Sequence, residues 1–230
     1  MTDVVAMLDQ TVSRFVRSAM GTSTLGASLD RLRLVRKATL EQVGVLSQQQ
    51  VDFSPGSGKW SVSQIVDHLV LTDGLYQPAF ERMISNARAG DESTLHISIR
   101  EMNPTVGPLP RALMPYVAPV FSLFSTLMPH AVRETLLRIP FLPSGNPTLS
   151  TPRPGRTVEQ LRHDLEQTLA KTEGQLLADL PPNFSRMRAE HPILGTNTAA
   201  QLLDLMSAHE ERHQTQIREV LKHLGSPRNT

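Results

Sequence analysis

The chain shows helical spacing of apolar residues in four segments, whereas the strict alternation typical of strands is scarce. In the first segment the apolar residues recur three or four positions apart and fall on one face. The four segments are residues 25–46, 62–83, 157–180 and 198–224. This pattern predicts an all-α fold in which four amphipathic helices bury their apolar faces in one core.

The predicted starts of three segments carry the same helix-capping signal. A serine or threonine accepts a hydrogen bond from an unpaired amide at the helix start, and a glutamine three residues later bonds back to it. The pairs are Ser61 with Gln64, Thr157 with Gln160, and Thr198 with Gln201. Pro181 and Pro182 end the third segment.

The second and third helices are joined by a proline-rich stretch. Residues 103–154 contain 11 of the 17 prolines. A short connection would suffice to cross a bundle, so we expect this stretch to carry helical turns of its own. We therefore predict one helical domain over residues 1–230, with an N-terminal extension over 1–24 and an insertion over 91–154.

The insertion contains a group of large apolar residues that the bundle itself does not need. We expect them to border the metal site predicted below and to shape an apolar substrate pocket, because exposed groups of this size need a partner. An appendage packed on the bundle and a homodimer contact are the alternatives. The residues are Phe121, Phe124, Leu127 and Met128.

Two histidines of the last segment, His209 and His213, lie four residues apart on its inward face. A buried imidazole without partners costs about 1–3 kcal/mol, so the pair requires either hydrogen bonds or a shared cation. His68 lies beside the inward stripe of the second segment. Three imidazoles from two facing helices predict a divalent metal site formed by His68, His209 and His213.

Zinc is the expected ion, while nickel, iron and manganese also bind imidazole. The other histidines lie off the inward stripes, near a helix end or in irregular segments, and His191 is expected to be structural. They are His96, His130, His163, His191 and His223.

Residues 209–213 also match the H-E-x-x-H pattern of zinc peptidases. A peptidase would need a third ligand after the motif, and the donors that follow, Glu219 and His223, lie on the same helix. Glu210 is about 100° round the helix from His209 and points away from the metal face. Thr72, one turn beyond His68, is better placed to touch a ligand, so a peptidase is the least favoured alternative.

The composition of the chain limits its possible binding partners and chemistry. The chain has 23 basic and 22 acidic residues, a net charge of +1, which gives no general attraction to nucleic acid. It has no cysteine, so disulfides, thiolate ligands and a cysteine nucleophile are excluded. Charged residues at positions 3, 9, 14 and 17 interrupt any signal peptide, and no run is apolar enough to span a bilayer. We therefore expect a cytoplasmic location.

Three stretches, "GKWSVSQIVDHL", "HPILGTNT" and "LLDLMSAHEERHQTQI", resemble the DinB-like four-helix metalloprotein superfamily over residues 25–88 and 155–225. The resemblance implies that His68, His209 and His213 bind a divalent metal. It also implies a link to enzymes that use low-molecular-weight thiols such as bacillithiol or mycothiol. The expected function is transfer of such a thiol to a small organic substrate, or hydrolysis of that substrate; a non-catalytic metal- or ligand-binding module is the alternative.

Overall fold

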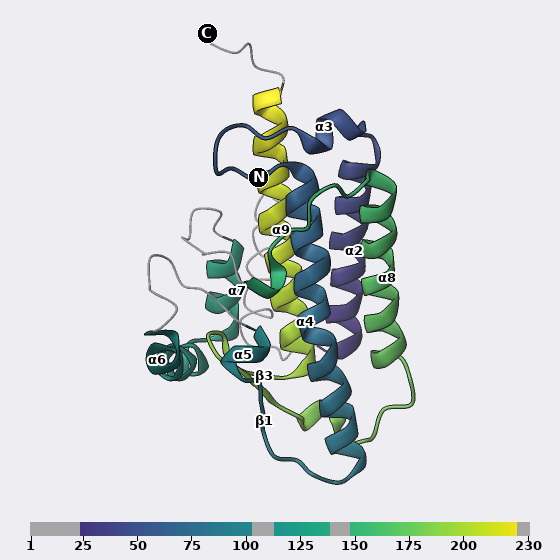
Figure 1. Cartoon of the computed structure of the whole chain (residues 1–230). Helices are drawn as coiled ribbons and strands as arrows, with labels where there is room; N and C mark the ends of the chain where they lie inside the picture. Colours follow the sequence, from purple (N-terminus) through teal and green to yellow (C-terminus); the bar gives the residue numbers. More distant parts are fainter. Residues whose placement is uncertain (1–23, 103–112, 139–147, 225–230) are drawn as a thin grey trace, which may run out of the picture.

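The computed structural model describes residues 24–102, 113–138 and 148–224 (Figure 1). Its main body is a bundle of four long helices, which confirms the predicted all-α four-helix fold. These helices are α2 (Leu25–Gly44), α4 (Val62–Arg88), α8 (Val158–Leu176) and α9 (Ala199–Leu224). The predicted N-terminal extension lies outside the described residues up to residue 23, and the division into domain, extension and insertion stays a prediction.

The predicted helix caps are present. The Ser61 hydroxyl accepts from the Gln64 amide at 3.3 Å, and the Gln64 side chain accepts from the Ser61 amide at 3.0 Å. The pairs at the starts of α8 and α9 make the same two bonds. A fourth capping box, between Ser47 and Gln50, begins the short helix α3 (Gln48–Asp52) and was not predicted.

Within the bundle, α2 and α4 each pack against both α8 and α9. The apolar core is divided along the helix axes into two clusters. One contains Leu29, Phe80 and Leu202, and the other contains Ile65, Leu165 and Ile217. On each of the four long helices, buried polar residues occur in the sequence between the residues of one cluster and those of the other.

Helices α4 and α8 run parallel. Gln77 bonds the carbonyl of Thr168, and Gln175 bonds both the Gln77 carbonyl and Glu81, so sequence numbers rise together on the two helices. A helix of 27 residues is about 40 Å long, and the chain must return over that length before α8 begins. The expectation that a short connection would suffice is therefore wrong.

The connection contains the helical turns that were predicted. They are α5 (Ile99–Met102), α6 (Met114–Leu127), α7 (His130–Arg138) and the 3-10 turn η2 (Thr148–Ser150). Helix α7 packs against α9, whereas α6 packs against strand β3.

A small sheet with the strand order β1-β2-β3 closes one end of the bundle. Strand β1 (Leu95–His96) is parallel to β2 (Ala189–His191), with Leu95 opposite Ala189, and β2 is antiparallel to β3 (Gly195–Asn197). The 3-10 turn η3 (Phe184–Arg186) precedes β2. Strands of two or three residues are too short to show alternation, so they could not be predicted from the spacing of apolar residues.

Gly195 permits the close contact between α6 and this sheet. Its φ is 69°, a region that favours glycine. A Cβ atom here would lie 2.5 Å from both the amide nitrogen and the hydroxyl of Thr126. Any other residue would therefore push α6 away from β3.

Among the helices of the described residues, none combines the length and apolar composition that crossing a bilayer requires.

His191 fixes the turn between β2 and β3. Its Nδ1 accepts hydrogen bonds from the amides of Ile193 at 3.1 Å and Leu194 at 3.0 Å, and its ring stacks on Tyr76. Burial lowers the pKa of His191 to about 4. The expected structural role of this histidine agrees with these contacts.

The substitution His191→Asn should change how the stability of the protein depends on pH. Asparagine can still accept from a turn amide but does not titrate. The unfolded histidine binds a proton near pH 6.5 and the folded one only near pH 4, so its stabilising contribution is present above pH 6.5 and is lost as the pH falls to about 4. Measured by chemical unfolding, the free energy of unfolding of the wild type should fall by up to about 3 kcal/mol more than that of the variant over this pH range.

The exposed His163 of α8 provides the control, since His163→Asn removes a histidine without touching the turn between β2 and β3. Parallel curves for the wild type and His191→Asn would contradict the prediction.

Candidate metal centre

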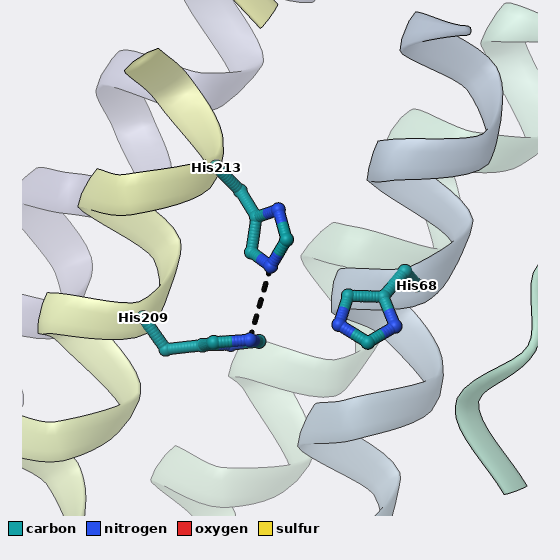
Figure 2. Close-up of side chains that lie close together, drawn as sticks. All are labelled: His68, His209 and His213. Atoms are coloured by element: carbon teal, nitrogen blue, oxygen red, sulfur yellow. Dashed lines mark hydrogen bonds between the residues drawn. The ribbon is translucent and has the colours of Figure 1, made fainter. Parts of the chain in front are cut away.

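The three predicted histidines converge in the middle of the bundle (Figure 2). His68 projects from α4 toward His209 and His213, which lie one turn apart on α9. One nitrogen from each ring lies within 4.8 Å of the other two. Among the described residues, no other group of three or more histidine, aspartate and glutamate side chains meets this criterion.

Hydrogen bonds orient two of the rings. The Nδ1 of His68 is 2.9 Å from the carbonyl oxygen of Ser150. A carbonyl only accepts, so Nδ1 carries the proton and Nε2 keeps a lone pair. His213 likewise donates from Nδ1 to Oε1 of Gln216 at 2.7 Å, which leaves its Nε2 unprotonated.

The site favours neutral imidazoles. Burial lowers the pKa of His68. Burial, followed by the proximity of the other imidazoles, lowers the pKa of His213 well below its ordinary value, and His209 behaves in the same way. The positive charge of Arg212 acts in the same direction on all three rings. Neutral imidazole is the form that binds a metal.

The spacing of the nitrogens fits a metal ion. The Nε2 atoms of His209 and His213 are 3.0 Å apart. Two nitrogens bound at about 2.1 Å to one ion would lie about 3.0–3.4 Å apart, depending on the coordination geometry. No carboxylate belongs to the cluster, so the protein would leave the charge of a bound divalent ion undiminished.

Two further side chains border the cluster. The half-buried ring of Trp60 lies 5.0 Å from the His68 ring and 6.5 Å from the His213 ring, measured between centroids. The Thr72 hydroxyl is 3.5 Å from Nε2 of His68; that it touches a bound substrate stays a prediction.

Glu210 does not take part in the cluster. It is 1% exposed, and its two carboxylate oxygens accept from the Arg36 guanidinium at 3.0 and 2.9 Å. Thr39 donates to the same carboxylate at 2.6 Å. A glutamate held in this way on the α2 side of α9 cannot serve as the water-activating base of a peptidase.

Arg36, which sequence reasoning missed, connects the bundle at this level. Besides Glu210 on α9 it donates to Asp73 on α4 and to Thr168 and the Leu165 carbonyl on α8. A signal for it was present in the sequence, because a charged residue occupies the inward stripe of α2 where an apolar one is expected.

The insertion reaches the histidine cluster, but through a different part from the predicted apolar group. The segment around residues 148–153 lies beside the metal cluster, where Ser150 bonds His68 and Arg153 bonds the buried Asp67 through its amide at 2.6 Å. Phe124 and Leu127 are 62% and 76% exposed on α6, which packs on the sheet. The prediction that they line a pocket at the metal site is wrong.

A comparison with known protein families identifies one family for this chain. The family model described as the DinB superfamily matches residues 31–217, a range that includes all three histidines. A search of curated proteins found no match. Among solved structures, the chain is similar to YfiT from Bacillus subtilis, described as "a probable metal-dependent hydrolase with an unusual four-helix bundle topology". The TM-score is 0.48 at 19% identity, covering 92% of this chain and 93% of that one.

Removing the acceptor for the His213 ring should weaken metal binding. Gln216→Ala leaves Nδ1 of His213 without its partner, and loss of such a bond to a ligand typically lowers metal affinity about 10–100-fold. Gln216→Glu keeps an acceptor and should retain the affinity. Competition with a chromophoric chelator measures both; equal affinities for the wild type and Gln216→Ala would refute the role of this bond.

Proposed function

The chain belongs to the DinB superfamily, and we propose that it is a divalent-metal-dependent enzyme acting on a small organic substrate. The observation that carries the proposal is the convergence of three neutral imidazoles from α4 and α9. Three protein ligands leave coordination positions open for a substrate, which distinguishes a catalytic site from a closed structural one.

A divalent cation held by His68, His209 and His213 would supply Lewis acidity toward a thiol or water at its open positions. The chain contributes the remaining functions. Ser150 and Gln216 hold two imidazoles in the tautomer that presents Nε2. The ring of Trp60 lies beside those of His68 and His213, and the Thr72 hydroxyl, 3.5 Å from Nε2 of His68, would donate a hydrogen bond to a substrate.

The favoured reaction is transfer of a low-molecular-weight thiol, and hydrolysis at the same centre is the alternative. The chain has no cysteine, so any thiol nucleophile must come from a second substrate. The resemblance to thiol-dependent transferases of this superfamily supports the same assignment. Zinc is the expected ion, with nickel, iron and manganese as alternatives.

The first test of the proposal concerns metal content. His68→Ala, His209→Ala and His213→Ala should each reduce the bound metal well below one ion per chain, measured by elemental analysis of protein purified without a histidine tag. Added metal should raise the thermal unfolding temperature of the wild type and not of these variants, because only the native site binds it. His163→Ala, at an exposed histidine of α8, is the matched control. Normal metal content in all three variants would exclude the site.

The second test concerns the reaction. Protein loaded separately with zinc, nickel, iron or manganese should consume a low-molecular-weight thiol in the presence of an electrophile panel, and metal removal should abolish the activity. Ester and amide hydrolysis are followed in parallel. Peptide cleavage that disappears in Glu210→Gln would establish a peptidase instead, and tight metal binding without turnover of any substrate would establish a binding module.

A further inference from the structure

Helix α6 exposes five large apolar side chains, whereas its buried residues are Met114, Ala118 and Ser122. Its outward residues recur at positions i, i+4, i+7, i+8 and i+11, and each is between 62% and 78% exposed. They are Tyr116, Val120, Leu123, Phe124 and Leu127, which we call the outer face of α6. The side packed on the sheet contains Ala118 and Ser122.

Such an arrangement requires a partner. A contiguous apolar stripe of this kind usually marks a contact surface. Helix α6 also contains no charged residue, so no charged side chain separates the apolar residues of its outer face. Within the described part of the chain, α6 packs on β3 and α5, and its outer face stays exposed.

The sequence before α2 supplies a matching stripe. Residues 1–23 lie outside the described residues and enter here by their sequence alone. Six of their large apolar residues are spaced to fall on one side of a helix, with the charged residues Asp3, Asp9, Arg14 and Arg17 outside that stripe. The stripe consists of Val4, Val5, Leu8, Val12, Phe15 and Val16.

The point of attachment brings this segment within reach of α6. Leu25, at the start of α2, packs against the apolar cluster that contains Leu95 and Ala189 of the sheet. Helix α6 rests on β3 of the same sheet. The start of α2 and helix α6 lie toward the same end of the bundle (Figure 1). A helix of 23 residues would be about 34 Å long, and an extended chain about twice that.

We propose that residues 1–23 dock through their apolar stripe onto the outer face of α6. The alternatives fit less well. Helices that lie on bilayers are rich in lysine and arginine, whereas residues 1–23 carry two acidic and two basic residues and α6 carries none. A second copy of the chain would compete with a segment whose tether gives it a local concentration in the millimolar range.

The absence of cysteine makes a crosslinking test possible in the full-length chain. The variant Phe15→Cys/Leu123→Cys is treated with a short bis-maleimide at low protein concentration, and products are separated by denaturing electrophoresis and mapped by mass spectrometry. Docking predicts an intrachain crosslink. The matched control, Arg17→Cys/Leu123→Cys, places the first thiol on the other side of the N-terminal segment and should lose that product. Leu123 is exposed, so its replacement does not disturb the core.

Hydrogen exchange provides a second measurement on single variants. Phe15→Asp should lose docking and thereby accelerate exchange in α6, whereas Arg17→Asp should not. Crosslinks between two chains would overturn the proposal in favour of a second copy. Equal crosslinking of both cysteine pairs, or none with unchanged exchange in Phe15→Asp, would also overturn it.

Discussion

The guanidinium of Arg36 is the point at which the four long helices meet. It is fully buried and bonds partners on α4, α8 and α9 from its own position on α2. A buried ion pair is seldom more stabilising than apolar packing, but a buried charge that loses its partners costs several kcal/mol. Alternative alignments of the helices would leave Arg36, Asp73 or Glu210 unpaired, so the cluster sets their relative heights. The histidine cluster depends on that setting because His209 and His213 flank Glu210 on α9, and His68 lies between one and two turns before Asp73 on α4.

The helices and the three histidines were predictable because both follow from helical periodicity. Residues three or four apart share a face, and the face rich in leucine and valine must turn inward. His209 and His213 therefore had to enter the core, and His68 had to meet them if the two helices packed together. The same geometry predicted that Glu210 would turn toward a different neighbour, as its bonds to Arg36 show.

The remaining features depend on contacts between segments far apart in the chain. The carbonyl of Ser150 carries no side-chain signal, and its contact with His68 depends on the path of the whole connection. The parallel course of α4 and α8 is equally invisible to local spacing, although it dictates the length of that connection. The apolar residues of α6 were recognised as needing a partner, but their direction depends on Gly195 and on the sheet beneath them.

The bond between Ser150 and His68 has a thermodynamic consequence. The imidazole of His68, a proposed metal ligand, is oriented by the backbone of Ser150, so binding of a cation at the proposed site and the position of the segment around residues 148–153 would be linked equilibria. Such coupling would be reciprocal: whatever free energy the bond to Ser150 adds to cation binding, a bound cation would return to the placement of the segment around residues 148–153. A ligand that reshapes the segment around residues 148–153 would thereby change metal affinity without touching the ion.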